Sequence, residues 1–164
     1  MVDVLTPAQR ALNMSRIRGK DTKPELLLRR GMHALGFRFR LHRKDLPGRP
    51  DLVFPSRRAV IFVHGCFWHG HSCPMCKMPA TRPEFWQLKI SGNRDRDKRA
   101  VNALTAAGWR VMVVWECSIR GLARLPPDAA VNAAAAFIRG EGKLKILSGA
   151  WAGSGNEGLE NSGT

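Results

Sequence analysis

Residues 51–73 read DLVFPSRRAVIFVHGCFWHGHSC, and two apolar runs in this stretch are joined by the turn Pro55-Ser-Arg-Arg58. Runs rich in Val, Ile and Phe on either side of a short turn predict two adjacent antiparallel strands, Asp51–Phe54 and Arg58–Val63. Cysteine and histidine residues follow the second run at once. We therefore expect a hairpin at the centre of a sheet, ending in a loop that carries the candidate functional residues.

A third buried strand is predicted at Trp109–Trp115, which reads WRVMVVW. The segment before it, Pro83–Ala107, is helical in pattern; we expect a break near Ser91–Asn93 and an end at Gly108. A helix that connects two strands lets them pair in parallel. The order of elements thus predicts a mixed sheet.

Further helices flank this centre. Thr6–Arg18 starts with a capping threonine and a proline and is predicted to be a short basic helix. Thr22 and Glu25 have the spacing of a capping box at the start of a second helix that ends at Gly36.

The alternating segment Phe37–His42 predicts a strand with one buried face, and Asp128 is expected to cap a last helix, Ala129–Arg139. Residues 140–164 are rich in glycine and lack a hydrophobic period, so we expect a flexible tail there. The fold class is α/β: one domain, residues 1–139, with a small mixed sheet and helices on both faces.

The charge of the chain points to a polyanionic partner. Lys and Arg number 27 and Asp and Glu 13, giving a net charge of +14, which favours nucleic acid. There is no lysine-rich amphipathic helix, secretory leader or run of about 20 apolar residues to indicate a membrane. We expect a monomeric protein of the cytoplasm that is associated with the nucleoid when bound to DNA, with no membrane partner.

Cysteine and histidine cluster in a way that indicates a metal. Cys66, His71 and Cys73 lie close together, and Cys117 follows the predicted strand at 109–115. Three thiolates and one imidazole would close a tetrahedral zinc site without an open position, which is typical of structural zinc. Alternatively, Cys117 is a buried thiol and Cys73-Pro-Met-Cys76 is a separate redox or metal pair.

A carboxylate and two histidines suggest phosphodiester chemistry. Asp51 follows the rigid turn Gly48-Arg-Pro50 and could bind Mg²⁺, while His64 and His69 could accept or donate a proton near neutral pH. Asp51 could also be a simple turn residue, and both histidines could be zinc ligands.

Large aromatic residues lie in the same loop. Phe67 and Trp68 could push between base steps of a duplex, whereas Trp109 and Trp115 on a predicted strand are better explained as core. The core interpretation also stays open for Phe67 and Trp68, because large aromatics are normally buried.

Five motifs bring these residues together: LPGRPD (46–51), VIFVHGCFWH (60–69), PATRPEFW (79–86), Asn93-x-x-Arg-Asp97 and GWRVxxVWEC (108–117). Over about residues 6–140 the chain resembles the very short patch repair (Vsr) DNA mismatch endonucleases. The resemblance implies a restriction-endonuclease-like fold related to the PD-(D/E)XK nucleases, with a structural zinc. It also implies Mg²⁺-dependent nicking 5′ to the thymine of a T:G mismatch in double-stranded DNA.

The resemblance further implies roles for individual residues. Mg²⁺ would be bound by Asp51 and the main-chain carbonyl of Val63. The general base would be His69, assisted by His64 and Asp97, with support from Glu25. Zinc would be held by Cys66, His71, Cys73 and Cys117, and DNA would be contacted by Phe67, Trp68, Trp86 and Asn93.

The chain departs from the family pattern at several positions. Val63 stands where threonine is familiar, Cys76 is an additional thiol that could compete for zinc, and the capping box alone could explain Glu25. Two other functions stay open: a PD-(D/E)XK nuclease with another DNA substrate, and a non-catalytic zinc-stabilised DNA-binding module. Mismatch-repair factors are possible protein partners.

Overall fold

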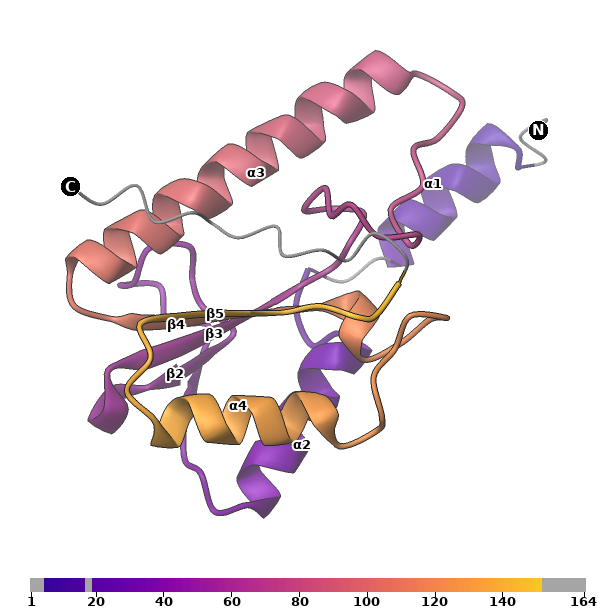
Figure 1. Ribbon diagram of the computed structural model, residues 1–164. Coiled ribbons are helices and arrows are strands. Elements are labelled where there is room, and N and C mark those ends of the chain that lie inside the picture. The colour runs from indigo at the N-terminus through magenta and orange to yellow at the C-terminus, as the bar shows by residue number, and fades with distance from the viewer. Residues whose placement is uncertain (1–4, 17–18, 152–164) are drawn as a thin grey trace.

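A five-stranded mixed sheet forms the centre of the protein (Figure 1). The computed structural model describes residues 5–16 and 19–151 of the 164 residues. The spatial order is β1-β2-β3-β4-β5; β1, β2 and β3 pair antiparallel, and β3, β4 and β5 pair parallel. The strands are β1 (Arg40–Leu41), β2 (Leu52–Phe54), β3 (Ala59–His64), β4 (Arg110–Trp115) and β5 (Leu144–Leu147).

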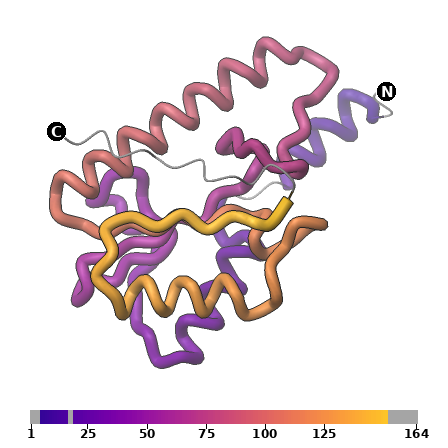
Figure 2. Tube along the Cα trace, in the orientation of Figure 1, coloured from indigo at the N-terminus to yellow at the C-terminus, as the bar shows by residue number. Residues whose placement is uncertain are grey.

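Helices cover both faces of the sheet, as expected (Figures 1 and 2). The helices are α1 (Pro7–Arg16), α2 (Lys23–Ala34), α3 (Pro83–Ala106) and α4 (Ala129–Arg139); short 3₁₀ turns follow β2 (η1, Pro55–Arg57) and β4 (η2, Glu116–Ser118). None of the described helices is long and apolar enough to cross a lipid bilayer.

Alternating residues of the central strands build two cores. Ala59 and Ile61 of β3 face α2 and α4, whereas Val60 and Phe62 face α3. This alternation follows from the two-residue period of a strand, and burial on both sides explains why β3 is apolar almost throughout.

The hairpin and the parallel crossover predicted from the sequence are both confirmed. Val53 of β2 lies opposite Val60 of β3, and α3 connects β3 to its parallel neighbour β4. In this register His64 lies beside Trp115. Residues that follow these two positions therefore leave the sheet side by side.

The predicted break in the helix after residue 83 is wrong, because α3 runs continuously from Pro83 to Ala106. Gly92 is tolerated within it at a cost of about 1 kcal/mol relative to alanine. Contacts on both sides of Gly92 offset this cost: Ile90 is buried, and Asn93 donates a hydrogen bond to the main-chain oxygen of Trp68 at 2.8 Å. The unbroken helix lets α3 reach from the sheet to the loop after β3.

The strand predicted at 37–42 is shorter than expected. Only Arg40–Leu41 pairs with β2, while Phe37 and Phe39 pack against Phe54 with ring centroids 6.1 and 5.5 Å apart. His42 has φ +47°, in the left-handed region, and its side chain lines the cleft described below. This backbone turn ends β1 after Leu41. Residues 37–39 before the strand do not pair with β2.

The two ends of the chain also differ from expectation. The flexible tail predicted at 140–164 is wrong for its first part, since β5 pairs in parallel with β4; residues 152–164 lie outside the described residues. The basic N-terminal helix is present as α1, and residues 17–18 of its predicted range lie outside the described residues. The last helix has the predicted bounds, although the Asp128 side chain makes no capping hydrogen bond.

Candidate active site and metal centre

The parallel register of β3 and β4 brings the cysteine and histidine cluster together. Cys66 lies two residues beyond His64, and Cys117 lies two residues beyond Trp115, the register partner of His64. Ligand atoms of four residues lie within 4.8 Å of one another: Cys66, His71, Cys73 and Cys117. All three thiols are buried, and the described residues that form this cluster do not include Cys76. These residues could hold a metal ion.

Hydrogen bonds favour thiolate character at Cys117. A bond from the Cys66 thiol lowers the pKa of Cys117, and His71 and the main-chain N–H of Gly149 add to this effect. The Gly149 nitrogen lies 3.3 Å from the Cys117 sulfur. Charge-stabilising donors around a thiolate are a common feature of metal centres.

Tryptophan rings enclose the imidazole of this cluster. Trp115 stacks on His71 at 4.2 Å with an interplanar angle of 15°, and Trp151 meets the same ring edge-on at 5.2 Å. Trp109 and Trp115 pack against the core on the α3 face, as expected.

Asp51 immediately precedes β2, and its carboxylate points toward β3. The main-chain N–H of Val63 donates to Asp51 Oδ2 at 2.6 Å. Burial, followed by the nearby charge of Glu25, raises the pKa of Asp51 to about 7, against the effect of the bond from Val63. Two buried carboxyl groups this close favour a bound cation.

Glu25 is both a helix-start residue and part of the same floor. Its N–H donates to Thr22 Oγ1 at 3.4 Å, which confirms the threonine cap. Its carboxylate accepts instead from the N–H of Asp21 at 3.1 Å and from Arg29 at 2.7 Å. The Glu25 side chain is 3% exposed.

Histidines from β3 and the following loop form a second group with α3. His69 Nδ1 donates to Asp97 Oδ2 at 2.5 Å, which leaves Nε2 of His69 as the acceptor nitrogen. His64 stacks on His69, and burial lowers the pKa of His64 to about 3. The described residues offer no hydrogen-bond partner to the buried Nδ1 of His64. Both histidines lie outside the Cys/His cluster. Ligand atoms of His64, His69 and Asp97 lie within 4.8 Å of one another and form a separate group that could itself hold a metal ion.

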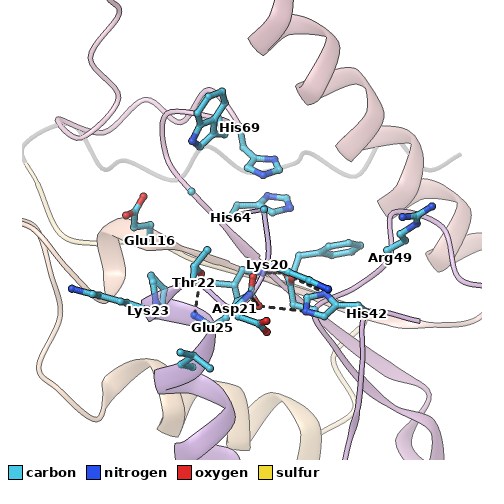
Figure 3. Close-up of a pocket in the computed structure, with 18 of the residues that line it drawn as sticks. Lys20, Asp21, Thr22, Lys23, Glu25, His42, Arg49, His64, His69 and Glu116 are labelled. Atoms are coloured by element: carbon cyan, nitrogen blue, oxygen red, sulfur yellow. Dashed lines mark hydrogen bonds and ion pairs between the residues drawn. The ribbon is translucent and has the colours of Figure 1, made fainter. Parts of the chain in front are cut away.

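A cleft of about 1330 Å³ joins these groups (Figure 3). Glu25, His42 and Asp51 line one part of it, and His64, His69 and Asp97 line another. Basic side chains also line it: Arg16, Lys20, Lys23, Lys44, Arg49 and Arg120. The cleft thus has carboxylate and imidazole groups at its floor and basic side chains around them. This combination suits a phosphodiester, because the basic groups attract its negative charge.

Phe67 and Trp68 of the loop after β3, here called the aromatic loop, form a cluster with Trp86 of α3. The cluster lies outside the two sheet-face cores of the described chain, and Trp68 lines the cleft. Phe67, Trp68 and Trp86 contact one another edge-on with centroids 5.1 to 5.9 Å apart, and all three are half-buried. Lys89 Nζ lies 5.6 Å from the Trp68 ring. The Asn93 side chain donates a hydrogen bond to the main-chain oxygen of Trp68, so Asn93 contacts the aromatic loop from α3.

Three residues of this site were missed in the sequence analysis. His42 and Arg29 contact Glu25, and Glu116 accepts a hydrogen bond from the N–H of Cys66 at 3.2 Å. Glu25 and Arg29 lie four residues apart on one face of α2, a spacing that could have indicated their ion pair. Asp21 lies before the Thr22 cap, outside the helix. His42 carried no such signal, because its orientation depends on the left-handed turn.

Comparison with known proteins identifies the class of enzyme to which a chain with this fold and cleft belongs. The profile of the family described as DNA mismatch endonuclease Vsr matches residues 2–75. The chain is 46% identical over 142 residues to the DNA mismatch endonuclease Vsr of Escherichia coli, covering 87% of this chain and 91% of that protein. It is 54% identical over 125 residues to the Type II nicking enzyme V.XorIIP of Xanthomonas oryzae pv. oryzae, covering 76% and 92%.

The chain therefore belongs to the Vsr family of DNA mismatch endonucleases. It is a DNA endonuclease, and the resemblance inferred from its motifs is confirmed.

Proposed function

We propose that this endonuclease nicks one strand of duplex DNA 5′ to the thymine of a T:G mismatch, using Mg²⁺ at Asp51. The observation that carries this proposal is the single basic cleft that holds both the Asp51–Glu25 floor and the His69–Asp97 pair. A DNA-binding module without catalysis has no need for such an arrangement. We expect one chain to suffice, since these groups come from one chain, and we expect it to act on chromosomal DNA in the cytoplasm.

The floor of the cleft suits Mg²⁺. Asp51 and the main-chain carbonyl of Val63 would hold the ion, and Glu25 would add negative charge nearby. The raised pKa of Asp51 fits this assignment, because crowded buried carboxyl groups are stabilised by a cation. When bound, Mg²⁺ would polarise the scissile phosphate.

His69 is the proposed general base. Its Nδ1–H is held by Asp97, so Nε2 is free to take a proton from the attacking water. The imidazole ring of His64 stacks face to face on that of His69 and fixes the plane of the His69 ring. Because burial keeps His64 neutral, it does not add a positive charge beside the base.

The Cys/His cluster is the proposed structural zinc site. Its donor set, three sulfurs and one imidazole nitrogen within 4.8 Å, fits tetrahedral zinc, and buried ligands leave little room for substrate. Zinc there would tie the loop after β3 to the end of β4. His69, Phe67 and Trp68 are in that loop, and Trp86 of α3 packs against both aromatic residues, so the metal would hold catalytic and DNA-contacting groups in place.

The aromatic cluster is proposed to enter the base stack. Phe67, Trp68 and Trp86 are only half-buried and are next to a lysine that could contact phosphate. A T:G pair costs less to unstack than a matched pair, which would favour the mismatch. Asn93 would then support the loop from behind.

The test is strand-resolved cleavage of four duplexes that differ only at one pair: T:G, T:A, C:G and A:C. We expect a single nick 5′ to the thymine of T:G, dependent on Mg²⁺ and lost in a chelator. Equal nicking of T:A would indicate a nuclease with another substrate. Tight binding without any cleavage in Mg²⁺ or Mn²⁺ would favour the non-catalytic module.

A further inference from the structure

Left-handed backbone conformations gather around the cleft. In the part of the chain that the structure describes, five residues other than glycine have a positive φ: Asp21, His42, Arg49, Arg58 and Arg82. The first three of them line the cleft. A side chain makes this conformation costly, and such residues persist where the surrounding structure or the function requires them.

Asp21 and His42 have partners that explain their positions. The Asp21 carboxylate accepts a hydrogen bond from Arg29 at 2.7 Å, and His42 Nε2 lies 2.8 Å from the same guanidinium. Arg49 differs from them, because its exposed side chain forms no hydrogen bond, ion pair or ring contact with any residue that the structure describes. Contacts within the protein therefore do not explain why an arginine occupies this position.

The two left-handed arginines outside the cleft also have partners. Arg58 donates to the main-chain oxygen of Ala107 at 2.8 Å. The Arg82 guanidinium lies over the Phe85 ring, 4.7 Å from its centre. These contacts offset the cost of the backbone conformation, so among the five residues Arg49 is the exception.

The turn that contains Arg49 would accept glycine on steric grounds. Gly48 has φ +74° and Arg49 has φ +49°, and the N–H of Arg49 donates to the main-chain oxygen of Leu46 at 3.2 Å. Pro50, which follows, is buried. Glycine adopts a positive φ without a steric cost. The turn itself thus does not require the arginine side chain.

We propose that Arg49 is a DNA-binding residue that contacts a backbone phosphate of the nicked strand, adjacent to the scissile phosphate. This inference rests on the proposed function, which puts the scissile phosphate at Asp51. Arg49 precedes Asp51 by two residues and lines the same cleft, on the side opposite Glu116 (Figure 3). A guanidinium keeps its charge and offers parallel donors that match the oxygens of a phosphate. Arg120 in this cleft already pairs with Glu116 at 3.3 Å, whereas no described carboxylate competes for Arg49.

The test uses duplexes in which single phosphates of the strand that carries the mismatched thymine are replaced by neutral methylphosphonates. Binding is measured without Mg²⁺ at one salt concentration, so that cleavage does not interfere. Neutralising the contacted phosphate should weaken binding of the wild type about tenfold. Arg49→Gly should bind the unmodified duplex about tenfold more weakly, and the same methylphosphonate should then have no further effect. If Arg49→Gly keeps the wild-type loss at both phosphates that flank the nick, the inference is overturned.

The salt dependence of binding gives a second readout. Arg49→Gly should reduce the slope of log affinity against log salt concentration by about 0.9, equally for T:G and T:A duplexes. The matched control is Arg57→Met, which removes an exposed arginine charge from η1 and should keep the wild-type slope. The same slope for Arg49→Gly and this control would show that Arg49 makes no phosphate contact.

Stability separates a binding role from a structural one. Glycine relieves the steric cost at φ +49° but adds freedom to the unfolded chain, so Arg49→Gly should melt at the wild-type temperature or a few degrees above it. A melting temperature several degrees lower, together with an unchanged methylphosphonate pattern, would assign Arg49 to the fold instead.

Failure of the proposed function would look different. A wild type that does not nick T:G duplex in Mg²⁺ would contradict the proposed function, whatever the binding of Arg49→Gly shows. Nicking 5′ to the thymine, together with a wild-type methylphosphonate pattern in Arg49→Gly, would contradict only the role of Arg49.

Discussion

His64 lies flat against His69, with ring centroids 3.9 Å apart and planes only 2° from parallel. His64 belongs to β3 and is buried, whereas His69 is in the loop after β3. The Nδ1 atom of His69 is held by a hydrogen bond to Asp97 of α3. Residues of β3 and α3 thus fix the imidazole ring of His69 between them. Its free Nε2 is the atom on which the proposed proton transfer depends.

Replacing Asp97 tests this arrangement. Asp97→Asn removes the charged acceptor that holds His69 Nδ1–H, so the nicking rate should fall about 10²-fold or more. Single-turnover cleavage with enzyme in excess separates this loss from DNA affinity. The control is Asp95→Asn, an exposed neighbour on α3 with the same change in charge. A rate for Asp97→Asn within twofold of that control would mean that Asp97 does not orient the base.

Metal analysis of cysteine variants tests the zinc site. Cys117→Ala should contain no zinc and yield little soluble protein, because metal binding is coupled to folding. Cys76→Ala should keep one zinc per chain and nearly full stability, since Cys76 is outside the cluster that the structure describes. The reverse pattern would mean that Cys76, and not Cys117, is the third sulfur ligand.

Truncation of Trp68 distinguishes intercalation from core packing. If Trp68 enters the base stack, Trp68→Ala should weaken binding to T:G duplex more than to matched duplex, measured at one fixed salt concentration. A core role predicts instead a loss of about 3–5 kcal/mol in stability and equal damage to both affinities. An unchanged affinity ratio together with a large fall in melting temperature would refute intercalation.

Gly149 fits tightly between the Cys/His cluster and the loop before α4. A Cβ at this position would lie 2.4 Å from the main-chain oxygen of Cys117 and 2.5 Å from that of Ala123. Gly149→Ala should therefore lower the melting temperature by several degrees and speed zinc loss to a chelator. Gly142→Ala, whose Cβ would meet nothing closer than 3.9 Å, is the control. Equal stability of the two variants would show that β5 and its extension can shift freely.

Much of the fold could be predicted because it depends on local pattern. The apolar runs at 51–63 and 109–115 predicted the hairpin and the parallel strand. Spacing alone left Cys76 as an alternative to Cys117, and the family resemblance pointed to the four residues that the structure brings together. Their convergence follows from the register of His64 with Trp115, which places Cys66 and Cys117 side by side. The apolar sequence pattern and the observed strand pairing agree here because β3 and β4 are each buried on both faces of the sheet.

The errors arose where distant contacts override local preference. Gly92 suggests a helix break, but Ile90 and Asn93 hold α3 together through their contacts outside the helix. The strand β5 has no hydrophobic run long enough to stand out, and it forms because the edge of β4 offers unpaired main-chain groups. His42 and Arg29 become part of the site only through the turn at His42 and the ion pairs of α2.

Single-turnover cleavage by Asp51→Asn tests the central claim most directly. The variant keeps the size of the side chain and an oxygen for the Val63 N–H but removes the charge that would hold Mg²⁺. We predict a fall in the nicking rate of at least about 10³-fold, equal to about 4 kcal/mol of transition-state stabilisation. Affinity for T:G duplex should stay within about threefold, because it comes from distributed Lys and Arg contacts. Nicking of T:G duplex at the wild-type rate by Asp51→Asn would contradict the account.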